Sequence, residues 1–184
     1  MRVRNHLLQQ LSDGRFHSGQ QLAQTLGISR SAVWKQVQRL ESELGLSVSA
    51  VRGRGYRLPR PLELLDAGRI RSELSTPAAA LLESLSLLPT TDSTNSRASR
   101  ELPRESGCAR VWLAEHQTDG RGRRGRPWVS NFGENLYISV AWRFDLPMSE
   151  LPGLSLVVGV VLAEVLAYLG FDGHSVKWPN DILV

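Results

Sequence analysis

The 184-residue sequence predicts an α+β protein of two domains, and three observations support this fold class. First, residues 1–60 hold ten Lys or Arg and three Asp or Glu, a net charge of +7, whereas the remainder carries −3. Second, Pro59 and Pro61 disfavour helix on both sides of Arg60. Third, residues 1–60 show helical apolar spacing followed by a hairpin pattern, and the later residues show strand patterns at 111–115 and 135–142 together with helix patterns. We therefore expect domains at residues 1–60 and 66–184, joined by a linker at 61–65.

Composition excludes several classes of protein. With 41% hydrophobic and 22% charged residues, the chain can bury a core and is not expected to be disordered. The single cysteine, Cys108, cannot form an internal disulfide, and no secretory signal pattern is present, so the cytoplasm is the expected compartment. The apolar stretch 154–169 is interrupted by Gly159 and Glu164 and is shorter than the ~20 residues of a membrane span. We expect a core helix from about Glu150 to Leu169, and no membrane partner.

Residues 1–60 predict three short helices followed by a β-hairpin. Apolar residues recur at three- and four-residue spacing in three segments, and Ser18 and Ser29 stand where the second and third helices would need N-caps. The tight turn at Gly27 between them is typical of a helix-turn-helix. After Gly45, two short strand patterns flank the sequence Arg52-Gly53-Arg54-Gly55. The whole segment is therefore predicted to be a winged helix-turn-helix with arginines at the tip of the wing.

Polar and cationic side chains on the third helix and the wing indicate DNA binding. Such a helix can enter the major groove, while arginines on the wing contact phosphates or the minor groove. The candidate DNA-binding residues are Arg30, Ser31, Lys35, Gln38, Arg52 and Arg54. A winged helix can also serve as a protein-interaction module whose arginines are simply solvated. Trp34 is either an exposed anchor or packs against the wing, and we expect it to pack.

A loop rich in arginine and glycine follows a predicted buried strand at residues 111–115. Glycines allow close approach of the backbone to a ligand, and guanidinium groups bind carboxylates and phosphates in a bidentate manner. The residues concerned are Gln117, Gly120, Arg121, Gly122, Arg123, Arg124, Gly125 and Trp128. The loop is therefore expected to hold an anion.

Three known motifs resemble this loop without matching it well. Its glycines fit the dinucleotide-binding pattern, but Arg126-Pro127 does not open the helix that such a site requires. The Gly-Lys-Ser/Thr of a P-loop is missing. The arginine-glycine segment also resembles an AT-hook, which binds the minor groove of DNA. However, the strand patterns at 111–115 and 135–142 place the loop inside a folded domain.

Two further segments carry polar groups suited to a ligand. Ser93-Thr94-Asn95 begins a predicted helix that extends to about Leu102, and could bind a small polar group or serve only as a cap. Lys177-Trp178-Pro179-Asn180-Asp181 lies in a predicted strand region. A cation followed by an Asn-Asp pair could serve a nucleotide phosphate and its Mg²⁺, which takes oxygen ligands.

Taken together, these three motifs resemble the biotin protein ligase family. The winged segment makes the chain similar to the bifunctional members, which also repress the biotin operon. The resemblance implies a catalytic domain with a mixed β-sheet, similar to the cores of class II aminoacyl-tRNA synthetases. It further implies that biotin and ATP give biotinyl-5′-AMP, and that biotin then passes to a lysine of the biotin carboxyl carrier protein. By the same resemblance, biotinyl-AMP promotes a homodimer that binds operator DNA.

The resemblance also assigns roles to residues. Biotin would be held by Ser93, Thr94, Asn95, Gln117, Gly120, Arg121, Arg123 and Trp128. Lys177, Asn180 and Asp181 would face ATP and its Mg²⁺, and Arg121, Arg123 and Lys177 would be catalytic. Fixed guanidinium groups and Mg²⁺ would offset the repulsion between a carboxylate and the α-phosphate that it attacks.

The family pattern continues beyond Val184 with a catalytic lysine, more of the sheet and a small β-barrel, so we expect this sequence to carry an incomplete ligase domain. The 184 residues alone would therefore lack part of the machinery for ligase activity. One alternative is a non-enzymatic, biotin-sensing DNA-binding regulator. Another is a lipoate-type acyltransferase with an incidental winged domain.

Overall fold

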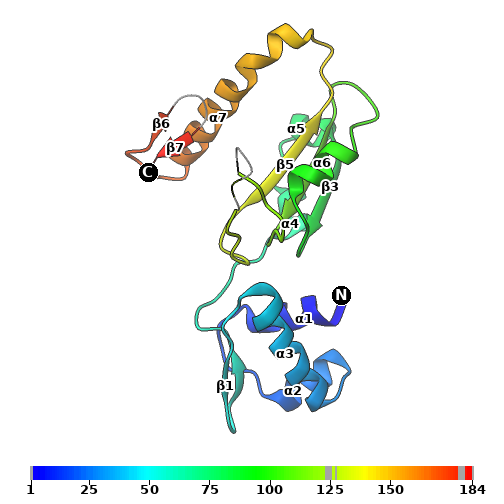
Figure 1. The fold of residues 1–184 in the computed structure, drawn as a ribbon, viewed down its shortest axis with the longest axis vertical. Helices are drawn as coiled ribbons and strands as arrows, with labels where there is room; N and C mark the ends of the chain where they lie inside the picture. Colours follow the sequence, from blue (N-terminus) through cyan, green and yellow to red (C-terminus); the bar gives the residue numbers. More distant parts are fainter. Residues whose placement is uncertain (1, 123–125, 127, 178–180, 184) are drawn as a thin grey trace. The chain divides into compact units, whose positions relative to one another are not determined.

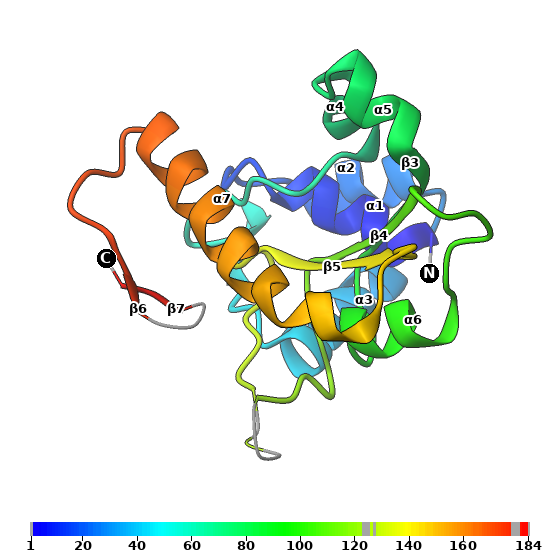
Figure 2. The ribbon, with the colours of Figure 1, turned by 90° about the horizontal axis from the view of Figure 1, so that it is seen from above.

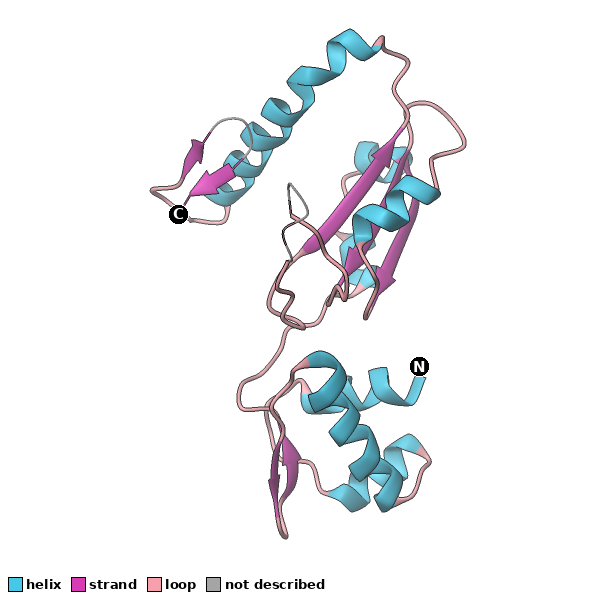
Figure 3. Ribbon diagram, viewed as in Figure 1, coloured by secondary structure: helices cyan, strands magenta, loops and turns pink. Residues whose placement is uncertain are grey.

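The computed structural model describes residues 2–122, 126, 128–177 and 181–183. The chain folds as two compact units, Met1–Arg143 and Phe144–Val184. The first unit holds a winged helix and a three-stranded sheet, and the second holds a long helix followed by a short hairpin (Figures 1 and 3).

The winged helix follows the predicted order of elements. They are α1 (Arg2–Leu11), α2 (Gly19–Leu26), α3 (Arg30–Leu44), β1 (Ser49–Val51) and β2 (Gly55–Arg57). Both predicted N-caps are confirmed: the Ser18 hydroxyl accepts a hydrogen bond from the backbone N–H of Gln21, and the Ser29 hydroxyl accepts one from Ala32. These caps satisfy backbone donors that the first helical turn leaves unpaired, so they fix where the two helices begin.

The core of the winged helix is completed by a residue distant in sequence. Its buried side chains from the three helices include Leu7, Leu8, Leu11, Leu22, Val33, Val37, Leu40 and Leu44. Phe132 joins the same cluster and is only 2% exposed. The linker is fastened as well, since the N–H of Leu62 donates to the carbonyl of Ser12 at 2.8 Å. The winged helix therefore shares its core with the segment that precedes β5.

The expectation that Trp34 packs against the wing is wrong. Its side chain is 53% exposed, while Val33 beside it is fully buried. The wing instead joins the segment before α2, where His17 and Tyr56 exchange two backbone hydrogen bonds of 2.9 Å. The edge strand of the wing is therefore paired with this segment, and Trp34 remains on the solvent-exposed face of α3.

The sheet of the first unit is mixed, as the resemblance implied. Its strands β3 (Leu82–Leu88), β4 (Ala109–Ala114) and β5 (Tyr137–Trp142) lie in that order, with β3 parallel and β5 antiparallel to β4. The sequence patterns indicated β4 and β5 but not β3.

Helices cover both sides of this sheet. Figures 1 and 2 show α6 (Thr94–Arg100) on one side, and α4 (Ala67–Ser72) and α5 (Thr76–Leu81) on the other. Ala98 of α6 packs on Trp112 and Ala141 in a small buried cluster. The N-terminus of α6 is thereby held over the sheet, beside the loop that leaves β4.

The helix expected at residues 150–169 is present in the second unit, but this unit alone does not bury it. It consists of η2 (Met148–Gly153), α7 (Leu154–Tyr168), β6 (Ser175–Lys177) and β7 (Asp181–Leu183). Gly159 is the one buried residue among those described in α7. The helix is apolar around its whole circumference, and it contacts mainly η2, β6 and β7, which are too small to cover it. By length and composition alone the stretch Ser149–Tyr168 would suffice to cross a membrane.

A buried carboxylate ties the linker to the sheet. Glu115, directly after β4, is 6% exposed, and its Oε1 accepts a hydrogen bond of 2.6 Å from the N–H of Leu65. Loss of hydration on burial raises the pKa of Glu115, and the single hydrogen bond from Leu65 only partly opposes this.

We expect Gly55→Ala to unfold the wing. Gly55 has a φ of +101°, and a Cβ there would lie 2.0 Å from the carbonyl oxygen of His17. Both the strain and the clash lower the free energy of unfolding, by at least about 2 kcal/mol, which urea titration would measure. Gly53→Ala is the matched control, because Gly53 also has a positive φ but open space around its Cβ position. Equal losses in the two variants would refute the clash.

We also expect Glu115→Gln to change how stability depends on pH. Because the folded-state pKa of Glu115 is raised, the native state binds more protons than the unfolded state just above the usual glutamate range. The wild-type free energy of unfolding should therefore fall as pH rises through that window, and the glutamine variant should lack this fall. Glu115→Ala should instead lose about 1–3 kcal/mol at every pH, since Leu65 loses its acceptor. Urea titrations between pH 4 and pH 8 would decide, and parallel wild-type and glutamine curves would contradict the raised pKa.

Candidate functional site

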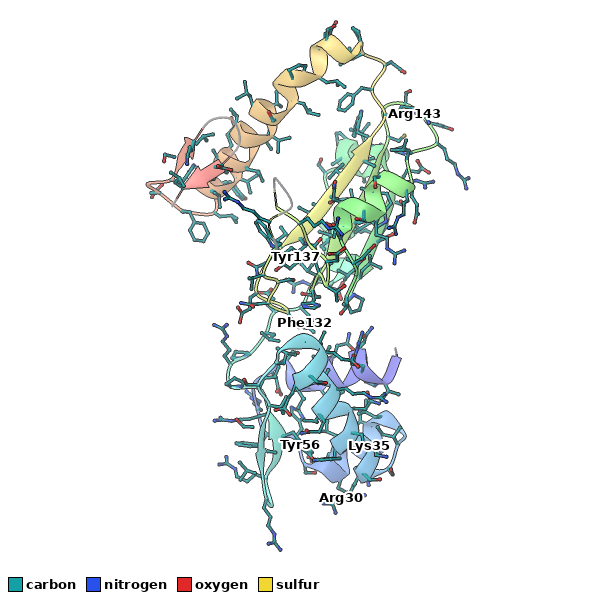
Figure 4. The ribbon with its side chains drawn as sticks, in the orientation of Figure 1. Arg30, Lys35, Tyr56, Phe132, Tyr137 and Arg143 are labelled. Atoms are coloured by element: carbon teal, nitrogen blue, oxygen red, sulfur yellow. The ribbon has the colours of Figure 1, made fainter. Side chains whose placement is uncertain are left out.

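One candidate interface lies between α3 and the wing. A groove of about 620 Å³ is lined by Arg30 and Ser31 at the start of α3, Gly19 at the start of α2, and Arg52 and Tyr56 of the wing. Figure 4 labels Arg30, Lys35 and Tyr56 in this domain. The groove joins cationic side chains to the N-termini of two helices, an arrangement that favours phosphate groups.

The predicted DNA-binding residues are all exposed, and several are already oriented. Exposed members are Arg30, Ser31, Lys35, Gln38, Arg52 and Arg54. The amide of Gln38 donates to Glu41 at 3.0 Å. The guanidinium of Arg54 lies 4.2 Å from the centre of the Phe16 ring, and that of Arg57 lies 4.8 Å from it. Phe16 thus holds two wing arginines in place by cation–π contact, a role that the sequence alone did not indicate.

A second candidate site forms where α6 begins and β4 has ended. Oε1 of Gln117 accepts hydrogen bonds from the N–H of Thr94 at 2.8 Å and from the hydroxyl of Thr94 at 3.2 Å. The hydroxyl of Ser139 in β5 donates to Oγ1 of Thr94 at 2.9 Å. The N–H of Gln117 donates to the hydroxyl of Ser130 at 2.8 Å. Four residues that are distant in sequence thus form one polar cluster, and Thr94 in it is only 4% exposed.

Backbone pairing fixes this cluster. Thr91 pairs with Gln117 as an isolated parallel bridge, and the N–H of Thr118 donates to the carbonyl of Thr91 at 2.9 Å. The carboxylate of Asp92 accepts hydrogen bonds from the N–H of Ser93 and the hydroxyl of Thr91, and these hold the pKa of Asp92 below its usual range. The segment before α6 therefore runs beside the segment after β4, which brings Thr94 and Gln117 together.

The arginine-glycine loop leaves directly from this cluster. The N–H of Trp128 donates to the carbonyl of Gly120 at 3.1 Å, so the loop closes on itself at its base. A Cβ on Gly120 would lie 3.1 Å from Nε2 of Gln117 and 3.3 Å from Cβ of Trp128. These distances are tighter than most Cβ contacts, so an alanine at this position would press on Gln117 and Trp128. Nη2 of Arg121 pairs with Asp119 at 2.9 Å, and the Trp128 side chain is 56% exposed.

The structure brings some predicted site residues together and leaves others apart. Thr94, Gln117, Gly120 and Trp128 lie around one point, with Arg121 in the adjoining loop. Ser93 caps α6, accepting a hydrogen bond of 3.5 Å from the N–H of Ser96, while Asn95 is exposed.

The remaining predicted site residues belong to the second unit or are not described. Lys177 and Asp181 are register partners in the β6–β7 hairpin and are both exposed. Arg123 and Asn180 lie outside the described residues. Within the described part of the chain, no group of three or more His, Cys, Asp or Glu is placed to hold a metal ion.

The polar cluster also contains residues that the motifs did not reveal. Ser130 and Ser139 belong to none of the three motifs, yet each hydrogen-bonds a predicted ligand-binding residue. Ser139 is the polar residue in the otherwise apolar segment 137–142, and strand periodicity, which was the available signal, places it with Tyr137 and Ala141 on the face of β5 that α6 covers.

Comparison with known proteins matches both halves of the chain. Residues 3–57 match an HTH domain model, and residues 87–184 match the biotin/lipoate A/B protein ligase family. The bifunctional ligase/repressor BirA of Salmonella typhimurium is 49% identical over 96% of this chain and 52% of its own length. The Escherichia coli protein of the same name is 46% identical over 96% of this chain and 52% of its own length. This chain thus spans about half the length of the curated relatives that it matches.

A biotin protein ligase from Aquifex aeolicus, solved with biotin and ATP, is 37% identical over 55% of this chain and 42% of its own, with a TM-score of 0.44. Since the ligase family model covers more than half of the residues, the chain belongs to the biotin/lipoate A/B protein ligase family.

Proposed function

We propose that this chain is part of a bifunctional biotin ligase and repressor. The ligase would join biotin to ATP and transfer biotin to a lysine of the biotin carboxyl carrier protein. Biotinyl-AMP would promote a homodimer on operator DNA. The observation that carries the proposal is the cluster of Thr94 and Gln117 beside the glycine-arginine loop. The names of the relatives, which are ligase/repressors, support the same function.

The polar cluster suits the head group of biotin. A ureido ring carries two N–H donors and one carbonyl acceptor, so a complementary site needs both kinds of group. The amide N–H₂ of Gln117 offers a donor for the carbonyl, and Gly120 lets the backbone groups of the loop approach the ring. The exposed ring of Trp128 can pack over the apolar part of the ligand. Ser93, Asn95, Arg121 and Arg123 complete the proposed biotin set.

The first reaction would bring two anions together. A biotin carboxylate oxygen forms a bond to the α-phosphorus of ATP, and the bond from that phosphorus to the bridging oxygen breaks, releasing pyrophosphate. Arg121, Arg123 and Lys177 would neutralise the developing charge. Asn180 and Asp181 offer oxygen ligands to the Mg²⁺ that accompanies ATP. In the second reaction a lysine amine of the carrier attacks the acyl carbon, and AMP leaves.

The winged helix would provide the DNA-binding function. We propose residues 1–60 as this domain, 61–65 as the linker and 66–184 as the N-terminal part of the ligase domain, and the ranges of the two matching family models support this division. A two-fold dimer would present two copies of α3 to paired half-sites. A single wing groove binds weakly, so a ligand that favours the dimer would strengthen binding through avidity.

We propose a cytoplasmic protein in which α7 packs within the protein rather than crossing a bilayer. The regular helix has 15 residues, because Pro152 lies in the preceding 3₁₀ segment. Its length is about 22 Å at ~1.5 Å per residue, less than the ~30 Å hydrocarbon core.

Formation of biotinyl-AMP tests the ligase. We expect acid-quenched reactions of labelled biotin and Mg-ATP to yield the adenylate, with Gly120→Ala lowering biotin affinity about tenfold or more, because its Cβ would press on the Gln117 amide. Gly153→Ala is the control, because Gly153 has open space around its Cβ position and an ordinary φ of −71°.

The assay should include the 184 residues and the same chain extended by the region that its relatives carry beyond the match. Biotin binding without adenylate from either protein would support a non-enzymatic sensor instead. Preference for lipoate over biotin would support a lipoate-type transferase.

Arg30→Ala tests the DNA interface. Loss of one phosphate contact should weaken binding to a random-sequence duplex and reduce the slope of log affinity against log salt by about one. Arg69→Ala removes the same charge outside the winged helix, where the exposed Arg69 side chain pairs with Glu63, and should change neither quantity. Equal effects of the two substitutions in fluorescence anisotropy titrations would exclude the groove as the DNA site.

A further inference from the structure

The hydrogen bonds of Gln117 determine which way its amide faces. A backbone N–H can only donate, so the atom 2.8 Å from the N–H of Thr94 must be the carbonyl oxygen Oε1. The amide nitrogen Nε2 therefore faces the other way, toward Gly120, where a Cβ would lie 3.1 Å from it. The site thus presents an N–H₂ donor to whatever occupies it.

The hydroxyl groups of Thr94 and Ser139 extend this chain of hydrogen bonds. The hydroxyl of Thr94 donates to Oε1 of Gln117 at 3.2 Å, so its oxygen is left to accept, and it accepts from Ser139 at 2.9 Å. Because Thr94 is almost fully buried, water does not readily replace Ser139 as the donor. The proton of Thr94 is thereby directed at Gln117.

The fold places Ser139 rigidly. It lies in the middle of β5, in register with Trp112 of β4, and Trp112 packs with Ala98 of α6. The helix that carries Thr94 and the strand that carries Ser139 are therefore held to the same buried cluster. A hydrogen bond between them needs little additional ordering of either side chain.

We propose that Ser139 is a positioning residue for ligand recognition, acting through Thr94 to keep the amide N–H₂ of Gln117 directed at the ligand. The inference rests on the proposed biotin site and adds a residue that does not itself touch the ligand. The ligand group that it serves is a hydrogen-bond acceptor, such as a carbonyl oxygen. Without Ser139, the buried oxygen of Thr94 loses its donor, and the hydrogen bond from the Thr94 hydroxyl to Gln117 loses the cooperative strengthening that the donor gives it, so one of the two restraints on Gln117 weakens.

Ser139→Ala tests the proposal through two readouts. We expect biotin affinity measured by calorimetry to fall about three- to tenfold, the range for one lost hydrogen bond. We also expect the two side-chain N–H signals of Gln117 in the ligand-free protein to move toward those of an unrestrained, solvent-exposed glutamine side chain in ¹⁵N–¹H spectra. Ser139→Thr keeps the hydroxyl and should restore both. The matched control is Ser99→Ala in α6, because the Ser99 hydroxyl donates only to the carbonyl of Ser96.

A double-mutant cycle separates this role from general packing. In a Thr94→Val background, Ser139→Ala should have no further effect on affinity, because the intermediary is gone. An undiminished effect there, or unchanged Gln117 signals in Ser139→Ala, would overturn the proposal. Should Ser139→Ala fail to fold, Ser139→Cys offers a near-isosteric weak donor for the same comparison. If the wild-type protein binds no biotin, the proposed function fails, and the Gln117 signals alone then decide the role of Ser139.

Discussion

The two hydrogen bonds from Thr94 to the side-chain oxygen of Gln117 are the contact on which the candidate ligand site depends. They join the first turn of α6 to the segment after β4, and the two residues are 23 positions apart in the sequence. The bond is available because β3 and β4 are parallel, so both strands end at the same edge of the sheet. The chain leaving β3 can then pair with the chain leaving β4 before α6 begins. The parallel pair thus creates the site, and the glycine-arginine loop extends from it.

The same strand end also serves the winged helix. Glu115 holds the linker through Leu65, while Gln117, two residues later, holds Thr94. The segment that leads into β5 also contacts both regions. Ser130 accepts a hydrogen bond from the N–H of Gln117, and Phe132 enters the core of the winged helix. Displacing the segment that carries the candidate ligand site would therefore disturb contacts with the winged helix that lie within a few residues of it.

Interactions between residues close in sequence could be predicted from the sequence, whereas contacts between distant segments could not. Ser18 and Ser29 were identified as caps because capping is decided within four residues. The glycine at position 120 was recognised for its freedom, although its actual neighbours, Gln117 and Trp128, required the fold. Phe132 in the winged-helix core and Ser139 against Thr94 could not be predicted, since both depend on tertiary contacts across long stretches of chain. Trp34 was misjudged because periodicity places it on a helix face without saying what that face meets.

The positive charge of Arg121 in the arginine-glycine loop is paired only weakly. Arg121 lies against Asp119, two residues before it, and both side chains are mostly exposed. Exposed ion pairs typically contribute less than about 1 kcal/mol, because water and salt screen them. A phosphate or carboxylate entering the loop can therefore take the guanidinium from Asp119 at little cost. Without a local carboxylate, the dense positive charge of the loop would repel itself and disfavour a closed form. Asp119 thus offsets part of the positive charge of Arg121 while leaving its guanidinium exposed to solvent.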